Sequence, residues 1–537
     1  MRAASPAPSL LPGFAALAFI AILIGGAFLG LIVEGAANPA AAVSAFDAYF
    51  IRIALFTLWQ AALSTLLAVA PAVLIARALS RHASFPGRGL ILRLFALPLG
   101  LPAIVAALGV LSLYGRAGYF AGWLSELAGG DWPGIYGLSG ILVAHVFFNL
   151  PLATRFLLEA LDTVPADQWR LASQLGMRAG PSFRLIEWPA LRAALPGAAG
   201  LVFMLCVTSF TVVLTLGGGP GATTLEVAIY QALRFDFEPA RAVALTLGQI
   251  SLTIAAVWLL SKLGGDAARE ANLGVSARRY LMPSWPETAA NAALILLAAL
   301  FVLGPLAAIV AAGFSADLPR LATEASVQRA ALTSLVLAAI SALLAVLISL
   351  ALTNARRALQ GNRRIGQRSF AEYLADTGPS FVLVVPPIVI GAGWFVLMRH
   401  VVDVFSLAPI MVVAVNAAMA MPFVIRAIRP AADSAAVRHD RLAASLGIAG
   451  WKRFRLIDWP SIRRPLATGF AFAMALSLGD LGVIALFGSD ALKTLPYLLL
   501  ERMGSYRTAD AAGLALIIAS VCLGLMMLAD YFAKERT

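Results

Sequence analysis

The sequence predicts an all-α, polytopic membrane protein with about twelve transmembrane helices. Its 537 residues are 61% hydrophobic and only 13% charged, and the mean hydropathy is +0.87. Apolar runs of about 20 residues recur from end to end, and a helix of this length spans a hydrocarbon core of roughly 30 Å. Because a backbone in lipid must satisfy its own hydrogen bonds, we expect each run to be a helix.

Each expected span is one of these apolar runs. The spans cover approximately residues 12–33, 53–77, 91–113, 135–158, 196–217, 242–261, 289–313, 330–354, 381–398, 407–428, 464–487 and 509–532. The first run, with Arg2 ahead of it, also fits a signal peptide. It is long for a signal core, however, and it has a matching run at 289–313, so we expect an uncleaved first helix.

Lys and Arg are distributed unevenly between the two sides of this topology. The termini and the even-numbered connections, counted with the residues that flank them, hold 30 of the 40, and the odd-numbered connections hold 10. Short loops rich in Lys and Arg stay cytoplasmic during insertion. Both termini are therefore expected in the cytoplasm, and the net charge of +12 reflects topology rather than a nucleic-acid partner.

One sequence unit occurs twice. Arg170-Leu171-Ala172 and Phe183–Pro189 match Arg441-Leu442-Ala443 and Phe454–Pro460 at a shift of 271 positions. A weaker match links residues 52–55 with 329–332 at a shift of 277, so insertions or deletions lie between the matched blocks. A chain built from a repeated unit is expected to form two similar halves.

The repeat divides the chain into two halves of six spans each, in the same orientation. The first half covers 1–265 with a cytoplasmic loop at 159–195, and the second covers 289–537 with a loop at 429–466. Residues 266–288 read as a cytoplasmic linker. Such halves are expected to be related by a pseudo-twofold axis along the membrane normal, with a path for cargo between them.

The best-matched part of the repeat is the cytoplasmic loop, although loops normally diverge. Pro165 suits the first helical position and Gly176 a C-terminal stop, so a helix is expected from Pro165 to Leu175. The second copy is expected from about Ala436 to Leu446, before Gly447, with a less defined start because it lacks the proline. The side chains expected near one face of the first helix are Trp169, Ala172 and Leu175. Two alike loops suggest one task performed twice, most simply docking onto two copies of one partner.

The pattern A-x-x-x-G, followed ten residues later by I-x-W-P, resembles the EAA signature of ABC importer permeases. The matching residues are Ala172, Gly176, Ile186 and Pro189, and then Ala443, Gly447, Ile457 and Pro460. Arg170 and Arg441 replace the usual Glu of the signature, and Trp188 and Trp459 its Leu before Pro.

The resemblance implies a fused permease in a bacterial inner membrane, whose loops couple to an ATPase. It implies two copies of an ATP-binding subunit, a periplasmic substrate-binding protein and a small-molecule substrate as partners. The residues implied to couple to the ATPase are Trp169, Arg170, Leu171, Ala172, Gly176, Arg441, Leu442, Ala443 and Gly447.

Longer strings resemble the members of this family that import thiamine. They include Asp167–Ala172, Ala222–Asp236 and Arg455–Pro460, and they cover both halves. The resemblance implies thiamine and its phosphates as cargo, while fused iron(III) permeases share the same plan and stay the alternative. A secondary transporter of the major facilitator type also has six plus six spans. Its basic motif between spans two and three is poorly matched by Leu79–Gly89.

The sequence lacks the motifs of an enzyme. Lys262, Lys452, Lys493 and Lys534 are its only lysines, and none follows a glycine as in a P-loop. We therefore expect ATP and Mg²⁺ on a separate subunit and no cofactor on this chain. The four histidines show no metal-ligand spacing, and both cysteines lie in apolar spans, so we expect no metal site, no disulfide and no catalytic residue. A membrane-embedded enzyme is the remotest alternative.

Polar residues inside the expected spans are candidates for the translocation path or gate. Asp480 lies toward the outer end of the eleventh span, and Ser209 is its counterpart at the 271 shift. His145 and Asn416 are a second such pair, in the fourth and tenth spans. A carboxylate at this depth faces a partner or a water-filled path, and Asp480 would favour a cationic cargo. The structural alternative is hydrogen bonding between helices.

Overall fold

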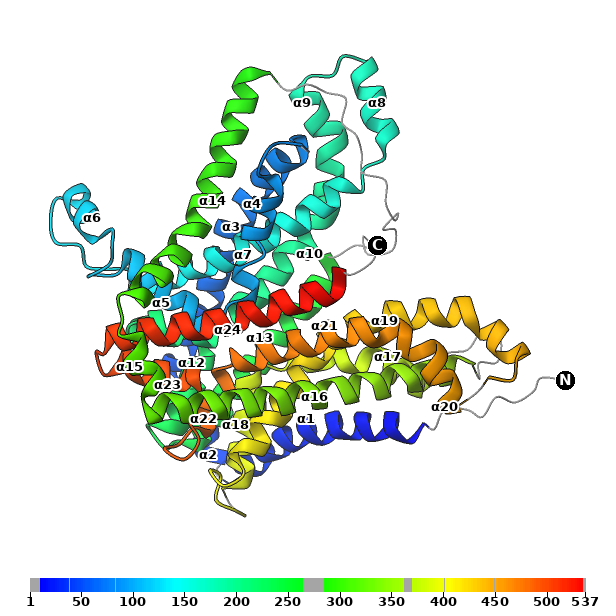
Figure 1. The fold of residues 1–537 in the computed structure, drawn as a ribbon. Helices are drawn as coiled ribbons and strands as arrows, with labels where there is room; N and C mark the ends of the chain where they lie inside the picture. The colour runs from blue at the N-terminus through cyan, green and yellow to red at the C-terminus, as the bar shows by residue number, and fades with distance from the viewer. Residues whose placement is uncertain are drawn as a thin grey trace. The chain divides into compact units, whose positions relative to one another are not determined.

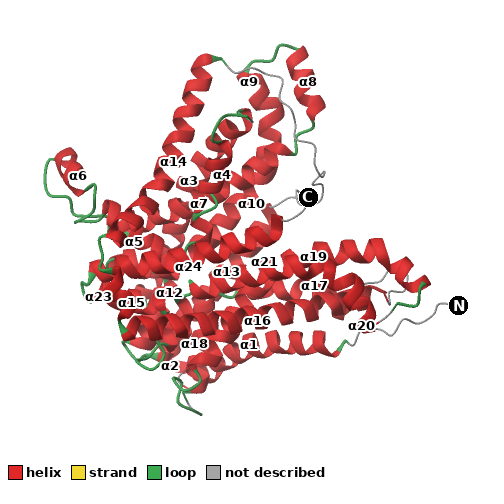
Figure 2. Ribbon diagram, viewed as in Figure 1, coloured by secondary structure: helices red, strands yellow, loops and turns green. Residues whose placement is uncertain are grey.

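The computed structural model describes residues 10–37, 39–82, 84–263, 284–361, 369–399, 401–448 and 450–534. Helices are the regular elements throughout these residues, and the described part contains no strand beyond one isolated bridge between Ser489 and Leu492 (Figures 1 and 2). The predicted all-α fold class is confirmed.

Nine helical segments among the described residues are long and apolar enough to cross a membrane. They are α1 (Leu11–Ala37), α3 (Ala48–Arg81), α7 (Leu138–Asp162), the continuous run that ends in α10 (Trp188–Val207), α13 (Pro239–Leu263), α14 (Trp285–Phe314), α16 (Ala325–Gly361), α19 (Ala408–Ser445) and α24 (Thr508–Lys534). A bent pair, α4 (Arg88–Leu94) with η1 (Pro98–Gly100) and then α5 (Ala103–Tyr114), would make ten. A count of about twelve spans stays a prediction.

The other expected spans lie where the helix is short or broken. Residues 91–113 form the pair α4–α5, bent by 113°, and Leu101, the residue before Pro102, has an extended backbone. In the region 381–398, Pro386 is also extended and leaves only the twelve-residue α18 (Pro387–Met398). The span expected at 464–487 is divided between α21 (Trp459–Leu478) and α22 (Gly482–Phe487). Proline, which disfavours helix in the residue before it, explains the first two breaks.

Shorter helices connect the long ones. They are α2 (Pro39–Ser44), α6 (Ala121–Ala128), α8 (Ala166–Gln174), α9 (Ala179–Ser182), α11 (Phe210–Leu216), α12 (Leu225–Arg234), α15 (Leu318–Thr323), α17 (Phe370–Phe381), α20 (Gly450–Arg453) and α23 (Leu495–Gly504).

One compact unit consists of Asp47–Val227 and Gly248–Ala316. Its core is an alanine-rich seam of α3, including Ala61, Ala68 and Ala72, together with side chains of α7 and α10. Small residues let helices approach closely, which is how helices pack in a membrane. Helix α14 belongs to this unit and buries Val302 in the same core.

The other compact unit consists of Met1–Phe46, Ala228–Leu247 and Asp317–Thr537. Helices α16, α19 and α21 pack together in it, and α1 packs on α16 and α18. The approach of α1 to α18 is so close that a Cβ at Gly30 would lie 2.1 Å from the carbonyl oxygen of Gly393. Trp394 Nε1 donates a hydrogen bond to the Leu23 carbonyl at 2.8 Å, and Arg399 pairs with the buried Glu34 at 2.9 Å. Helix α1 is therefore anchored on this unit by packing, a hydrogen bond and an ion pair.

These compact units differ in composition from the halves 1–265 and 289–537 that the repeat defines. Helix α1 precedes the first half's other helices but packs with α16 and α18, and α14 opens the second half but packs with α3 and α5. The repeat describes sequence similarity and the units describe compactness, so the half boundaries stay a prediction. Most of the expected linker 266–288 lies outside the described residues.

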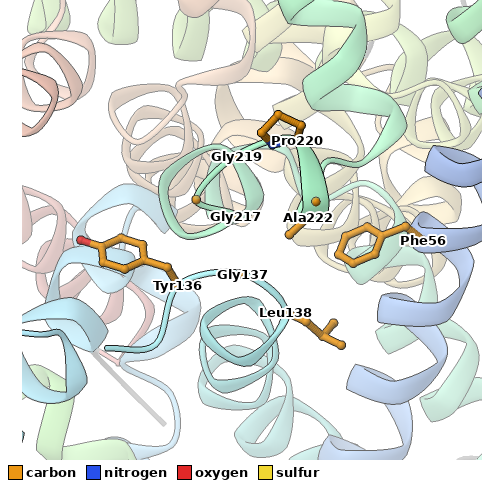
Figure 3. A pocket seen from close by; sticks show the side chains of 10 residues that line it. Phe56, Tyr136, Gly137, Leu138, Gly217, Gly219, Pro220 and Ala222 are labelled. Atoms are coloured by element: carbon orange, nitrogen blue, oxygen red, sulfur yellow. The ribbon is translucent and has the colours of Figure 1, made fainter. Parts of the chain in front are cut away.

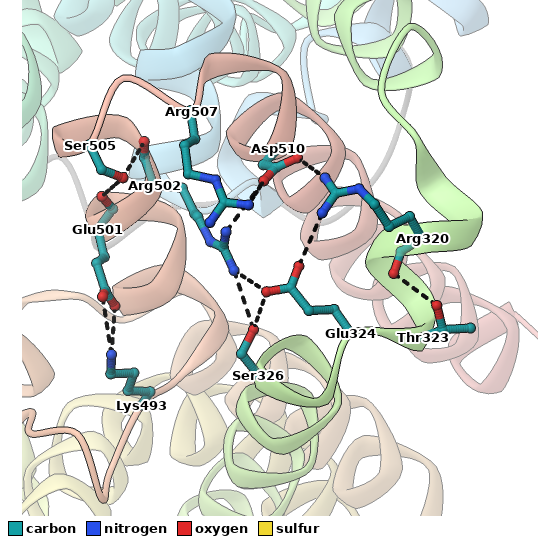
Figure 4. A network of polar contacts seen from close by, with 10 residues as sticks. All are labelled: Arg320, Thr323, Glu324, Ser326, Lys493, Glu501, Arg502, Ser505, Arg507 and Asp510. Carbon is teal, nitrogen blue, oxygen red and sulfur yellow. Dashed lines mark hydrogen bonds and ion pairs between the residues drawn. The ribbon is translucent and has the colours of Figure 1, made fainter.

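Within the compact unit that contains Asp317–Thr537, an ion-pair network joins α15 and the start of α16 to α23 and α24 (Figure 4). Arg502 contacts Glu324 and also Asp510, the latter at 3.3 Å. Asp510 pairs with Arg507 at 2.8 Å and with Arg320. The network therefore holds the beginnings of α16 and α24 beside the end of α23.

Candidate functional site

The first repeated loop contains the helix that the sequence predicts. Helix α8 runs from Ala166 to Gln174, directly after Pro165. Gly176 follows with φ of +60°, a left-handed conformation that favours glycine and ends the helix. The helix is where the sequence predicts it, one residue shorter at each end, because Pro165 is its N-cap rather than its first helical residue and Leu175 is its C-cap.

The second loop differs at its beginning. Helix α19 continues unbroken from Ala408 to Ser445, so no separate helix begins at Ala436 and that boundary is wrong. The reason is local: Ala436 occupies the position of Pro165, and alanine is the best helix former. The end agrees with the prediction, because Gly447 has φ of +62°.

Both loops continue into the same unusual element. A π-helix covers Phe183–Glu187 in the first loop and Phe454–Asp458 in the second, at the 271 shift. Each leads directly into a long helix, α10 or α21, that begins with Trp-Pro. Since π-helices are rare, this agreement shows that the repeat extends from sequence to backbone geometry.

The inner face of the first loop holds Trp169 and Ala172. Both are buried, and they pack with Val164 and with Ile186 of the π-helix. Ala443, the counterpart of Ala172, is buried as well. These residues shape the loop from inside. The prediction that Leu175 shares this face is wrong: Leu175 lies at the C-cap of α8 and is 62% exposed.

The outer face carries the same two leucines in both loops. Leu171 is 56% exposed and its counterpart Leu442 is 57% exposed; Leu175 is 62% exposed and its counterpart Leu446 is 63% exposed. A spacing of four residues places each pair on one side of a helix. We call Leu171 with Leu175, and Leu442 with Leu446, the leucine pairs.

Arg170 and Arg441 lie beside the leucine pairs and are also exposed. Arg170 forms an ion pair with Asp167 at 3.2 Å, one turn earlier on α8. Because both side chains of this pair are mostly exposed, it contributes little to stability. The outer surface is thus apolar at the leucine pair with a guanidinium next to it.

The acidic residue before each Trp-Pro fixes the loop to a long helix. Arg77 and Arg81 of α3 donate to the two oxygens of buried Glu187 at 2.6 and 2.9 Å, and both also donate to the Ala179 carbonyl. In the second loop Arg357 of α16 donates to Asp458 at 3.4 Å. Sequence reasoning missed these anchors, although an acid occurs at the same position in both copies of the repeat.

The candidate gate residues of the first half are brought together. His145 of α7 is buried, with Nδ1 2.9 Å from Ser64 Oγ of α3 and Nε2 2.8 Å from Ser209 Oγ. Ser209 lies at the break between α10 and α11. These are interhelical hydrogen bonds, as the structural alternative predicts, and a role in the cargo path stays a prediction.

The candidates of the second half lie at the corresponding break. Asn416 of α19 donates to Ser477 Oγ at 2.9 Å. Asp480 lies between α21 and α22, and its Oδ1 accepts from the Gly482 amide at 3.2 Å. Its Oδ2 is buried and has no hydrogen-bond partner among the described residues. Asp480 is therefore a buried carboxyl group with one oxygen that makes no hydrogen bond to the described residues.

A pocket of about 360 Å³ opens beside the glycine-rich segment Gly217–Ala222 (Figure 3). Phe56 and Tyr136–Leu138 complete its lining. Helix α12 follows this segment, and Leu225 and Ile229 are fully buried.

Long apolar helices, joined to two alike loops that each expose a leucine pair, define a polytopic membrane protein with a repeated cytoplasmic-loop motif. The chain belongs to the family of the binding-protein-dependent transport system inner membrane component, whose model matches residues 72–264 and 365–536. By family it is an inner-membrane transport permease.

Relatives match nearly the whole chain. It is 58% identical over 534 residues to the thiamine transport system permease protein ThiP of Brucella abortus (strain 2308), covering 99% of this chain and 97% of that protein. It is 40% identical over 521 residues to the protein of the same name from Escherichia coli (strain K12), covering 96% and 94%. The sulfate transport system permease protein CysT of Escherichia coli (strain K12) is 30% identical over 185 residues, which are 34% of this chain and 65% of CysT.

Proposed function

We propose that the chain is the membrane subunit of an ATP-driven importer of thiamine and its phosphates. The full-length relatives named as thiamine transport permeases support this cargo. A periplasmic binding protein delivers the cargo, two copies of an ATP-binding subunit hold ATP and Mg²⁺, and both termini lie in the cytoplasm. The chain itself carries no cofactor.

The single observation that supports the docking of two ATP-binding subunits is the agreement of the leucine pairs. Leu171 and Leu442, and Leu175 and Leu446, differ by one percentage point in exposure although their loops begin differently. Exposed apolar side chains that recur at matched positions favour contact with a partner over chance exposure. Arg170 and Arg441 complete each contact.

Contacts inside the first loop connect α8 mechanically to α10 and α3. Trp169 joins α8 to the π-helix through Ile186, and the next residue, Glu187, is bonded to Arg77 and Arg81 of α3. Movement of α8 by a closing ATPase therefore displaces α10 and α3 together. In the second loop, movement at Leu442 acts directly on α19, because the helix is unbroken.

Asp480 would contribute the charge selectivity of the path. Its unpartnered oxygen suits the positive charge of thiamine. His145 with Ser209, and Asn416 with Ser477, hold the two breaks in place beside the path. The broken helices then act as the gate that opens toward either side.

Co-purification of the tagged chain from its native membrane, with mass spectrometry and an ATPase assay, tests the proposal. We expect a P-loop subunit at two copies per chain, with ATP turnover stimulated by the binding protein plus thiamine. Replacing all four leucines by glutamate should abolish this association. Stimulation by iron instead of thiamine would overturn the cargo, and the absence of any ATPase would overturn the proposed function.

A further inference from the structure

The second loop exposes two apolar side chains that the first loop lacks. Val437 is 85% exposed and Trp451 is 74% exposed. At the 271 shift their counterparts are Ala166 and Gly180. The two loops therefore share the leucine pair but differ in two further exposed apolar side chains.

Trp451 is held in a defined orientation. Its ring stacks on that of Phe454, with centroids 5.1 Å apart and an interplanar angle of 25°. Phe454 in turn contacts the ring of Trp459 at 6.1 Å. A side chain that is already ordered loses less conformational entropy when a partner covers it, so Trp451 is suited to binding.

The backbone beneath the second leucine pair is also ordered in advance. Leu442 lies on the 38-residue helix α19, and Leu446 follows its last residue. In the first pair Leu171 lies on the nine-residue α8 and Leu175 follows its last residue, and a turn separates α8 from α7. A short helix is marginal in isolation, so α8 depends on the packing of Trp169 for its order.

We propose that the two loops bind the two identical ATP-binding subunits with unequal affinity, and that the second loop, with Val437 and Trp451, is the tighter site. This inference rests on the proposed function. The same protein fits both loops because the leucine pair is common to them, and the additional apolar side chains belong to the same loop, with Val437 five residues before Leu442 and Trp451 five residues after Leu446. During assembly, the site on the second loop would therefore bind an ATP-binding subunit before the site on the first loop does.

Versions of the full-length chain with one docking surface each test the inference. In lipid nanodiscs, Leu171→Glu with Leu175→Glu leaves only the second surface, and Leu442→Glu with Leu446→Glu leaves only the first. Each is titrated with the ATP-binding subunit recovered from the native membrane. We expect the second surface to bind about tenfold more tightly, a difference of about 1.4 kcal/mol in binding free energy.

Exchanging the unshared residues provides the matched control. Val437→Ala with Trp451→Gly should reduce the affinity of the second surface to that of the first. Ala166→Val with Gly180→Trp should raise the affinity of the first surface to that of the second. A Cβ at Gly180 would meet no atom within 4 Å, so a larger side chain fits there. The exchange in the first loop leaves the second loop unchanged. It therefore remains informative if the exchange in the second loop impairs folding, and thermal unfolding shows whether it does.

Equal affinities of the two single-surface versions, or exchanges that leave both affinities unchanged, overturn the inference and leave the proposed function intact. Exchanges that leave both affinities unchanged are also the result expected if Trp451 contacts lipid instead of the subunit. Failure of the unmodified chain to bind the subunit at all is a different result, since it contradicts the proposed function itself.

Discussion

Thr57 Oγ1 accepts a hydrogen bond from the backbone amide of Leu225 at 3.1 Å, and so fixes the first residue of α12 to α3. The relationship recurs in the other unit, where Ser334 Oγ of α16 accepts from the Leu495 amide of α23 at 2.7 Å. Thr57 and Ser334 are counterparts at the 277 shift. The repeat therefore includes a tertiary contact that satisfies a buried amide at a helix start.

Thr57→Val should destabilise the protein and reduce uptake. Valine keeps the shape but removes the acceptor, and the buried Leu225 amide is left unpaired at a cost of about 1–3 kcal/mol. Thermal unfolding in detergent and cargo uptake in proteoliposomes measure the two effects. Thr57→Ser, which keeps the hydroxyl, is the control and should behave like the unmodified chain. An unchanged Tm for Thr57→Val contradicts the role of this hydrogen bond.

Glu187→Gln should lower stability by roughly 3 kcal/mol, because it removes the charge that two arginines share in a buried site. Glu187 is fully buried, while Arg77 and Arg81 are only partly exposed. The control is Glu287→Gln, since Glu287 is 35% exposed and lies 3.9 Å from Arg81. We expect the control to cost less than about 1 kcal/mol. Equal losses for the two variants, by thermal unfolding, would show that Glu187 is not the anchor.

Asp480→Asn should weaken uptake of a cationic cargo roughly tenfold, a loss of about 1.4 kcal/mol in transition-state or binding free energy. The substitution keeps the size of the side chain and removes its charge. Uptake of labelled thiamine against concentration gives affinity and rate. Asp490→Asn is the control, because the Asp490 side chain is fully exposed. If Asp480→Asn transports like the control, Asp480 has no part in cargo selection.

Gly393→Ala should disrupt the docking of α1. A Cβ at this position would lie 2.2 Å from the Ala27 carbonyl oxygen, so α1 and α18 must separate. We expect a loss of about 1–3 kcal/mol, typical of overpacking. Gly25→Ala on α1 is the control, since its Cβ meets nothing within 4 Å. A Tm that falls equally in both variants would refute the close approach of the two helices.

The network around Glu324 should make stability depend on pH in the acid range. The hydrogen bond from Ser326, and then Arg502, lowers the pKa of Glu324 from its usual 4.5. A lowered folded-state pKa means that this contribution is complete above pH 4.5 and is lost as the pH falls through the folded-state pKa. The difference in Tm between the unmodified chain and Glu324→Gln should therefore be present at pH 7 and shrink below pH 4.5. A difference that grows with acid would contradict the ion pairs of Figure 4.

Features that depend on local chemistry could be predicted from the chain alone. Hydropathy over about 20 residues identifies membrane helices because lipid leaves a backbone no other way to satisfy its hydrogen bonds. Pro165, Gly176 and Gly447 set helix ends through their own backbone preferences, and the structure has the ends there. The 271 shift identified the loops because both copies kept the same residues.

Tertiary structure alone decided the features that depend on contacts between distant residues. Glu187 meets Arg77 and Arg81, and His145 meets Ser64 and Ser209, only after the helices pack. The docking of α1 on α18 depends on Gly30 and Gly393, which lie hundreds of residues apart. Leu175, at the C-cap of α8, is likewise exposed and stays outside the cluster that Trp169 forms with Ile186. Burial and pairing of this kind arise only when the helices assemble. A short stretch of sequence does not predict them, because the residues in contact lie far apart along the chain.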